Sequence, residues 1–264
     1  MARTLLLASS QYAVNTSAAP VTGYPCTLHC LYKPAGIPSA SFDQHTLVSI
    51  NASNNDNLMI QLYKHNTGSP LDRIRAVGYG SGATVFRTRL KLQTLSVGTW
   101  YAITGVFTNS TTYEIYVDAA AGNENLNTGT VTLATLTQFD VGSFRAGAGT
   151  YGNGDIAEVA VWDAALTVPE ITSLAARVSP QQIRPGNLVA YAPLMGKSSP
   201  EPELVSGLSL TLTNTPAEAV HPRVFRPSMV QRRMYATAAS APTITALSAI
   251  GITATSAQPR ISYS

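Results

Sequence analysis

Short hydrophobic runs, rich in β-branched and aromatic residues, recur along most of this 264-residue chain. Clusters of Gly, Pro, Asn and Ser separate the runs, and many short strands divided by turn signals are typical of an antiparallel sandwich or a closed barrel. We therefore predict an all-β protein. The runs predicted as strands cover residues 5–7, 26–32, 46–50, 58–63, 73–79, 85–92, 100–108, 113–117, 131–133, 139–143, 156–162, 188–193 and 208–212.

Two adjacent runs, 100–108 and 113–117, carry the clearest hairpin signal. Residues 109–111 between them are turn formers, and strict alternation places Tyr113 and Val117 on the same face of the second strand. We therefore predict that these two runs pair with each other directly.

One segment instead has the spacing of a helix. Thr167 and Glu170 form a capping box, and Pro169 is tolerated in the first turn of a helix. Pro180 limits how far this helix can continue. The apolar residues that follow the cap at helical spacing are Ile171, Leu174, Ala175 and Val178.

Charge is scarce along the chain. Charged residues make up 12% of it, about half the share of a typical soluble domain. The net charge of +3 and the pI of 8.9 come without the clustered Lys and Arg that a nucleic-acid-binding face requires. The one basic cluster, residues 221–233, is interpreted as an exposed or partner-facing segment rather than as a nucleic-acid site.

Two cysteines, Cys26 and Cys30, lie four residues apart in a predicted strand. Their Cα atoms are then about 13 Å apart at ~3.3 Å per residue, and a disulfide needs about 7 Å or less. Both thiols are therefore predicted to be free and buried. His29 points to the opposite face, so a metal site is not indicated. No apolar run approaches the roughly 20 residues of a membrane-spanning helix.

Catalytic motifs are missing from the sequence. Glycosidases use two carboxylates that face one cleft, and the nearest pair, Asp155 and Glu158, is predicted to point to opposite faces of a strand. No Gly-x-Ser-x-Gly segment precedes a helix. The Gly-rich segments 78–82 and 147–154 are predicted to be loops at one end of the sandwich. We therefore predict a protein without enzymatic activity and without a cofactor.

Several segments, taken together, resemble the laminin-G-like, concanavalin A-like jelly-roll superfamily. Residues 98–107 and 113–118 resemble two partner strands of that family, although Ala119 stands where Gly is usual. Residues 139–143, 154–163, 165–171, 188–194 and 208–212 resemble its closing strands and small helix. The resemblance covers roughly residues 1–222 and implies a sandwich of two antiparallel sheets with one short helix.

The resemblance is strongest to versions carried by tailed bacteriophages. Residues 183–194 (IRPGNLVAYAPL) and His221-Pro222 resemble segments that precede a C-terminal arm in those proteins. This implies a virion location and a non-enzymatic structural role, as a capsid decoration protein or a tail or fibre component. The implied partners are the major capsid or tail protein and further copies of the chain. The alternative is a glycan-binding, lectin-like adhesion module on the virion surface.

A lectin-like role needs an exposed aromatic platform with polar groups beside it. The candidate residues are Tyr79, Tyr151 and Asn153, all in the Gly-rich segments. Some relatives also bind calcium at the rim of the sandwich, which takes several carboxylates in one place. The candidate ligands here are scattered along the chain, so we expect little dependence on calcium. They are Asp43, Asp56, Asp118, Asp140 and Asp155.

The character of the chain changes after Pro222. We therefore divide it into a sandwich over residues 1–222 and a basic linker with an extended, β-rich C-terminal arm over residues 223–264. The arm has too few large apolar residues for a core of its own, and an unpaired strand would promote aggregation. We predict that it adds a strand to a neighbouring subunit or to the major structural protein. The predicted contact residues are Arg223, Arg226, Arg232, Arg233, Ile244, Leu247, Ile250, Ile252 and Ile261.

Overall fold

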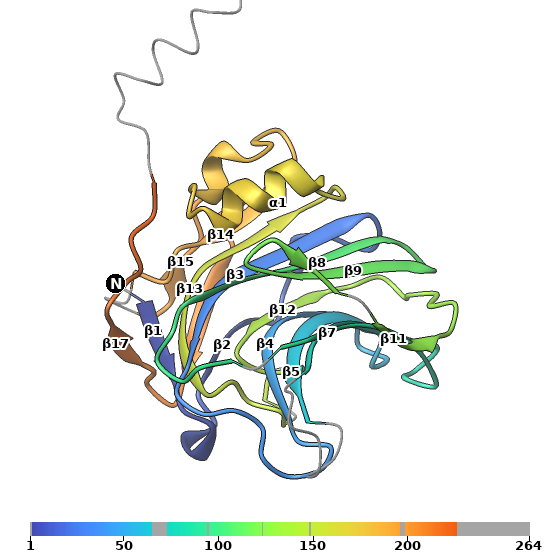
Figure 1. The fold of residues 1–264 in the computed structure, drawn as a ribbon, viewed down its shortest axis with the longest axis horizontal. Coiled ribbons are helices and arrows are strands. Elements are labelled where there is room, and N and C mark those ends of the chain that lie inside the picture. The colour runs from blue at the N-terminus through green and yellow to red at the C-terminus, as the bar shows by residue number, and fades with distance from the viewer. Residues whose placement is uncertain are drawn as a thin grey trace, which may run out of the picture. The chain divides into compact units, whose positions relative to one another are not determined.

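The computed structural model describes residues 2–64, 73–93, 95–122, 124–147, 149–195 and 199–225. These residues form two antiparallel sheets packed face to face, and a short helix covers the outer side of one sheet (Figure 1). The predicted all-β sandwich with one short helix is confirmed. The predicted arm contacts from Arg226 onward lie outside the described residues.

The first sheet has the strand order β10-β9-β8-β3-β13-β1-β17, and β14 also pairs with β13. Its strands are β1 (Ala2–Leu5), β3 (Cys26–Pro34), β8 (Tyr101–Asn109), β9 (Thr112–Val117), β10 (Ala120–Ala121), β13 (Gly154–Trp162), β14 (Leu188–Ala192) and β17 (Ala217–Ala219). The predicted hairpin of residues 100–108 and 113–117 is confirmed as β8 and β9.

The second sheet has the strand order β11-β7-β6-β5-β4-β12-β2-β16-β15. Its strands are β2 (Tyr12–Asn15), β4 (Gln44–Asn51), β5 (Asn57–Tyr63), β6 (Arg73–Gly80), β7 (Val85–Leu92), β11 (Glu124–Thr128), β12 (Gln138–Val141), β15 (Glu201–Pro202) and β16 (Ser209–Thr213). Two 3-10 turns, η1 (Leu7–Ser9) and η2 (Pro180–Gln182), lie outside the sheets.

The main core lies between the two sheets, where alternate residues of each strand meet. Leu58 and Ile60 of β5 face this core and are completely buried. Cys26 and Cys30 of β3 belong to the same core as free thiols, while His29 packs on the other face against Trp162. Burial raises the pKa of both thiols, so they behave as small hydrophobic side chains.

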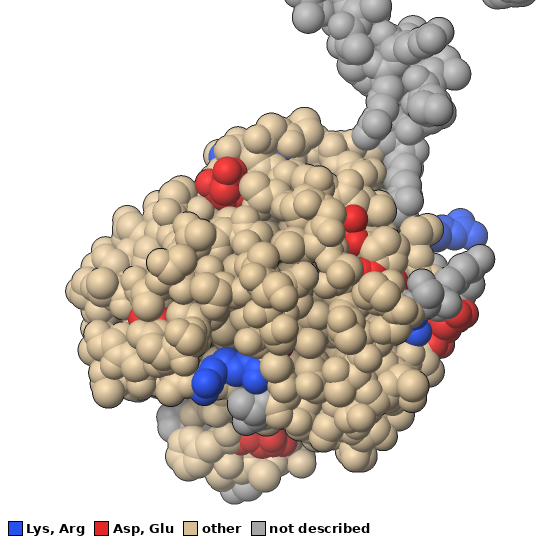
Figure 2. Space-filling view, turned by 180° about the vertical axis from the view of Figure 1, so that it is seen from behind, with Lys and Arg blue, Asp and Glu red and all other residues tan. Residues whose placement is uncertain are grey.

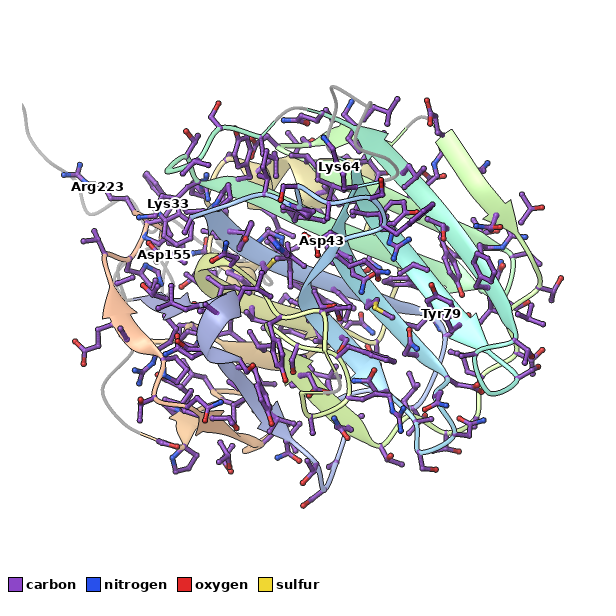
Figure 3. All side chains as sticks on the ribbon, turned by 90° about the horizontal axis from the view of Figure 1, so that it is seen from below. Lys33, Asp43, Lys64, Tyr79, Asp155 and Arg223 are labelled. Carbon is purple, nitrogen blue, oxygen red and sulfur yellow. The ribbon has the colours of Figure 1, made fainter. Side chains whose placement is uncertain are left out.

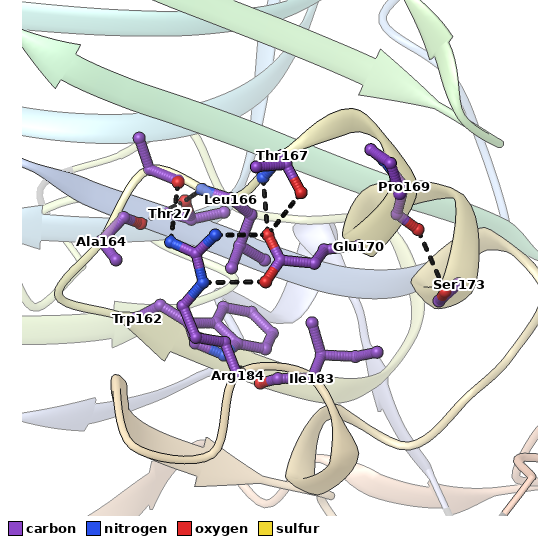
Figure 4. A network of polar contacts seen from close by, with 11 residues as sticks. Thr27, Trp162, Ala164, Leu166, Thr167, Pro169, Glu170, Ser173, Ile183 and Arg184 are labelled. Carbon is purple, nitrogen blue, oxygen red and sulfur yellow. Dashed lines mark hydrogen bonds and ion pairs between the residues drawn. The ribbon is translucent and has the colours of Figure 1, made fainter.

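The helix α1 (Val168–Ala175) begins at the predicted capping box. The backbone N–H of Thr167 donates to Oε2 of Glu170 at 2.7 Å, and Pro169 lies in the first turn. Arg184 donates to both carboxylate oxygens of Glu170, at 2.8 and 2.6 Å (Figure 4). This ion pair connects the first turn of the helix to the segment that follows η2. Its residues that bury against the first sheet are Ile171 and Leu174.

Two of the predicted strands are wrong. The first strand ends at Leu5, and Leu7 opens the turn η1 instead of continuing it. Residues 131–133 form no strand, because Val131 donates its N–H to Ser110 and the segment lies against β6. The sequence also missed β2, β10, β11, β15 and β17, each of which is only two to five residues long.

The prediction that residues 78–82 form a loop is also wrong in part. Gly78 and Gly80 belong to β6, and only residues 81–84 turn. A Cβ on Gly78 would overlap the hydroxyl of Tyr113, and one on Gly80 would overlap the carbonyl of Thr132. Glycine is required here by this close approach inside a strand. The residue between the two glycines, Tyr79, therefore faces the opposite side of the sheet.

Residues 220–225, which we call the strap, follow β17. Phe225 forms a bridge with Val178, its N–H donating to Arg177 at 2.6 Å and its carbonyl accepting from Ser179 at 3.0 Å. His221 lies 3.0 Å from the buried Glu158. The compact unit therefore extends to Phe225 and includes Arg223, whose side chain is exposed.

Charged side chains are only scattered over the face shown in Figure 2. The largest area of that face carries neither Lys or Arg nor Asp or Glu. Within the described part of the chain, no helix has both the length and the apolar character needed to cross a membrane.

Candidate functional site

The outer face of the second sheet carries a row of side chains that the strand register brings together. Asn51 of β4 pairs with Asn57 of β5, Asn57 pairs with Tyr79 of β6, and Tyr79 pairs with Phe86 of β7. A pocket of about 280 Å³ opens on this face, and we call it the second-sheet pocket. Its lining residues are Gln44, Asn57, Met59, Gln61, Tyr79, Ala83, Phe144 and Thr150.

A loop after β12 forms one wall of this pocket. The backbone N–H of Thr46 of β4 donates to the carbonyl of Thr150 at 2.7 Å, and the hydroxyl oxygens of the two residues lie 2.8 Å apart. The hydroxyl of Ser49 donates to the carbonyl of Ser143 at 3.0 Å. These bonds hold the loop over the sheet, and they place Phe144 and Thr150 at the pocket.

Asp140 of β12 fixes the same loop from below. Its carboxylate accepts hydrogen bonds from Asn51, Gln138, Ser143 and the backbone N–H of Ala146, at distances between 2.6 and 3.2 Å. Burial raises its pKa to about 6 in spite of these bonds, which act in the opposite direction. Asp140 therefore organises the loop rather than facing a ligand.

A buried arginine supports the floor of the pocket. Arg75 of β6 is 4% exposed, and its guanidinium donates to Oε1 of Gln61 at 3.0 and 2.7 Å and to Oε1 of Gln44 at 2.8 Å. Gln61 in turn donates to Thr46 at 2.8 Å. The guanidinium also lies 4.1 Å from the ring centre of Tyr63. The two glutamines that line the pocket are thus held in fixed orientations.

Hydrogen-bonding capacity remains unused in this region. Oδ1 of Asn57 is buried at the pocket and has no partner in the described part of the chain. Oδ1 of Asn51 and the hydroxyl of Thr88, which do not line the pocket, are also buried without such a partner. No described residue accepts a hydrogen bond from Nε2 of Gln44. Buried polar atoms in folded proteins are almost always satisfied. The unpaired acceptor of Asn57 and the fixed donor of Gln44 in one pocket therefore indicate that water or a ligand with hydroxyl groups binds there.

An aromatic surface borders these polar atoms. The ring of Tyr79 stacks on that of Phe86, with ring centres 5.4 Å apart and planes inclined by 24°. Phe144 lines the pocket from the loop. Aromatic rings beside amide groups are well suited to a ligand ring that has an apolar face and hydroxyl groups at its edge. The apolar face packs on the aromatic ring, and the hydroxyls bond to the amides.

The structure separates the three residues predicted to bind glycans. Tyr79 lines the second-sheet pocket. Tyr151 stacks on Tyr12 with ring centres 6.0 Å apart, and its hydroxyl donates to Gly147. Asn153 uses its carbonyl to accept from Ala35 and Tyr32.

Sequence reasoning missed the strand residues Gln44, Asn57 and Gln61. The signal for Asn57 and Gln61 was the polar half of the alternation in β5, which reads NLMIQLY, whereas Gln44 opens β4. That pattern normally marks a solvent-facing side, whereas these side chains are buried or nearly so beneath the loop.

A second, wider depression of about 710 Å³ lies on the first sheet. There Lys33 pairs with Asp155 at 2.5 Å, and the hydroxyl of Thr4 donates to the same carboxylate at 2.6 Å. Figure 3 shows that this pair lies well away from Tyr79. Because its central charges already satisfy each other, we regard the second-sheet pocket as the candidate site. The lining residues of the depression are Thr4, Lys33, Asp155, Glu218, Ala219, Val220 and His221.

The sequence can now be compared with known families. A sequence model described as the concanavalin A-like lectin/glucanases superfamily matches residues 8–172, more than half of the chain. The chain belongs to this superfamily. The predicted resemblance is thereby confirmed, and the sandwich is a concanavalin A-like jelly roll. None of the curated proteins matches the chain.

Three solved structures illustrate the shared fold. A putative carbohydrate binding protein from Bacteroides ovatus ATCC 8483 is similar over 82% of this chain and 61% of its own, at 15% identity and a TM-score of 0.55. A native heptameric SAP-like pentraxin from Limulus polyphemus is similar over 77% of this chain and 89% of its own, at 12% identity and a TM-score of 0.50.

The third is the enzymatically active domain of bacteriophage CBA120 tailspike protein 2, similar at 16% identity and a TM-score of 0.50. The alignment covers 67% of this chain but only 28% of the tailspike chain. At such identities the three similarities establish the fold alone.

The two acidic residues of β13, Asp155 and Glu158, lie on the same face of this concanavalin A-like sandwich. The prediction that Asp155 and Glu158 face opposite sides is wrong. The register of β13 shifts between Ala157 and Ala160, and Glu158 has a φ of +52°, so a bulge adds a residue to the strand. Glu158 therefore shares the outer face with Asp155, where it accepts from the hydroxyl of Tyr191 at 2.7 Å.

The five carboxylates considered as calcium ligands do not come together as a group of three or more in the described part of this concanavalin A-like domain. Asp56 accepts from the N–H groups of Gly82 and Ala134, and Asp118 accepts from that of Ala102. Asp140 and Asp155 are engaged as described above, and Asp43 accepts from Gln44. No three metal-binding side chains converge within the described ranges. Each of these five carboxylates already accepts a hydrogen bond within the protein.

Proposed function

We propose that this domain is a non-catalytic carbohydrate-binding module of a bacteriophage particle, with the second-sheet pocket as its site. The observation that carries the proposal is the unpaired Oδ1 of Asn57, buried in a pocket that Tyr79 and Phe144 flank. A sugar hydroxyl would satisfy this acceptor, and the apolar face of the sugar ring would pack on an aromatic ring. The similar carbohydrate binding protein and phage tailspike support this choice.

The absence of catalysis is part of the proposal. Most enzymes that hydrolyse a glycosidic bond use two carboxyl groups, one on each side of that bond. Of the described residues that line the second-sheet pocket, none is Asp or Glu. Amide, hydroxyl and aromatic groups can bind and orient a sugar, but they supply neither the general acid nor the nucleophile.

A glycan array probed with the full chain tests this site. We expect binding that Tyr79→Ala and Phe144→Ala each weaken by about tenfold, the effect of removing one stacking contact. Tyr151→Ala is the matched control, because it removes the same kind of ring from outside the pocket. If only Tyr151→Ala weakened binding, the site would lie on the loop of residues 147–153 instead. If no glycan were bound, the function itself would be wrong.

We further propose that the chain is a structural component of the particle and that residues 223–264 attach it to the major capsid or tail protein or to further copies of the chain. The strap supports this assignment, because it anchors the chain on the sandwich as far as Phe225. The exposed Arg223 begins a basic stretch that includes Arg226, Arg232 and Arg233.

Attachment is tested by comparing the full chain with a chain that ends at Phe225. We expect the full chain to sediment with particles and the shortened chain to remain in the supernatant, while both bind the same glycans. Equal sedimentation of the two chains would exclude the arm as the attachment segment.

A further inference from the structure

The arginine beneath the second-sheet pocket has a charge that no carboxylate in the described part of the chain balances. Arg75 is 4% exposed, and its hydrogen-bond acceptors are the neutral amide oxygens of Gln44 and Gln61. Its other close partners among the described residues are the side chains of Tyr63 and Tyr79, which are also neutral. The charged pairs found elsewhere in this domain, such as Arg3 with Glu201 and Lys33 with Asp155, each join a cation to a carboxylate.

Burial of an unpaired cation is costly, because protein replaces the water that would solvate the charge. Burial lowers the pKa of the Arg75 guanidinium, but arginine stays protonated at any pH at which proteins are normally folded. The positive charge therefore persists next to the pocket. A negatively charged ligand in the pocket could compensate this charge, because both glutamines that Arg75 contacts line that pocket.

The arrangement of the glutamines directs this charge toward a ligand. Arg75 takes the oxygen of Gln44, which leaves the Nε2 donor of that amide without an acceptor. An amide whose oxygen is bound to a cation is polarised and becomes a better donor. The pocket thus has a donor end at Gln44, backed by a positive charge, and a separate acceptor at Oδ1 of Asn57.

We propose that the second-sheet pocket selects acidic sugars, in which a carboxylate on the ring faces Gln44 and Arg75. This inference rests on the carbohydrate-binding function proposed above and adds the class of ligand. The ring hydroxyls of the same sugar serve Asn57, and Tyr79 or Phe144 receives the face of the ring. Arg75 acts through Gln44 and Gln61 and is a positioning residue that sets specificity.

The test is an array of matched pairs, each an acidic oligosaccharide beside its methyl ester or the corresponding neutral sugar. Oligogalacturonates and their methyl esters are one such pair, with identical rings and different charge. We expect at least one acidic member to bind with an affinity at least about tenfold higher than that of its neutral partner. This is the effect of one partly buried charge interaction. The preference should weaken as salt is raised, since salt screens charges.

Two variants assign the preference to Arg75. Arg75→Gln should bring the affinities of the acidic and neutral members together, whereas Arg75→Lys should retain part of the difference because it retains the charge. Should Arg75→Gln fail to fold, the salt dependence of the unaltered chain still decides the question. Equal binding of acidic and neutral members would overturn this inference and leave the proposed function in place. Binding to no member of any pair would overturn both.

Discussion

At the scale of single residues, buried polar groups set the shape of the second-sheet pocket. Asp140 holds the loop over the sheet through four hydrogen bonds, and Arg75 fixes the two glutamines of the floor. The close approach of Gly78 to Tyr113 directs Tyr79 outward. Each of these groups is buried, so each has a measurable effect on stability.

Asp140 should make the stability of the domain depend on pH. Burial raises its pKa from 3.8 to about 6, so the folded state favours the neutral carboxyl. The resulting contribution to the free energy of unfolding is full below about pH 3.8 and is lost as the pH rises through about 6. Asp140→Asn lacks this titration. We expect the unfolding free energy of the variant to rise, relative to the unaltered chain, by about 2 kcal/mol between about pH 4 and pH 7.

Urea denaturation at several pH values measures this difference. Asp163→Asn, which removes an exposed carboxylate, controls for the change in net charge. Parallel stability curves for Asp140→Asn and the unaltered chain would show that Asp140 is ionised in the folded state throughout the range.

Gly78→Ala should destabilise the domain strongly. The new Cβ would overlap the hydroxyl of Tyr113 and lie close to Leu58, and overpacking of this kind costs about 1–3 kcal/mol. Gly186→Ala is the matched control, because nothing lies within 4 Å of the position of its Cβ. Thermal denaturation should show a clear loss for the first variant and almost none for the second. Equal melting temperatures would mean that β6 can shift away from Tyr113.

At the scale of elements, the helix α1 is the part that the sequence predicted in most detail. The capping box, the proline in the first turn and the buried Ile171 and Leu174 are all as expected. The pairing of Arg184 with Glu170 was not expected, because a residue 14 positions away in sequence gives no local signal. The short strands were missed for the same reason, since partner strands rather than their own residues hold them in place.

Glu170 both caps the helix and pairs with Arg184, and mutations can separate these two roles. Thr167→Ala should cost about 1 kcal/mol, the usual effect of losing a helix cap. Glu170→Ala should cost about 2 kcal/mol, because it removes the cap and also leaves Arg184 without its carboxylate. Thr172→Ala, on the exposed side of the helix, is the control and should change stability by less than about 0.5 kcal/mol. Equal costs for Thr167→Ala and Glu170→Ala would show that the pairing with Arg184 contributes nothing.

At the scale of the whole molecule, the strap decides where the folded unit ends. The sequence places the boundary at Pro222, where the composition changes. The structure keeps residues 223–225 on the sandwich through the bridge between Phe225 and Val178. Backbone pairing of this kind depends on a distant partner, so composition carries no trace of it.

Truncation at two positions measures the contribution of the strap. A chain that ends at Phe225 should melt at the same temperature as the full chain. A chain that ends at Pro222 loses three hydrogen bonds of Phe225. At about 1 kcal/mol each, their loss should lower the melting temperature by roughly 6–12 °C. Identical melting of the two shortened chains would show that the sandwich is complete without residues 223–225.

The sequence by itself determined the class of fold, the hairpin, the capped helix and the burial of Cys26 and Cys30. These follow from alternation, turn residues and caps, which are properties of neighbouring positions along the chain. Only the tertiary structure decided which polar residues meet. Gln44, Gln61 and Arg75 come from three strands whose register places them side by side, and a bulge in β13 moved Glu158 to the face of Asp155. Register and bulges are set by packing between strands, so no local pattern specifies them.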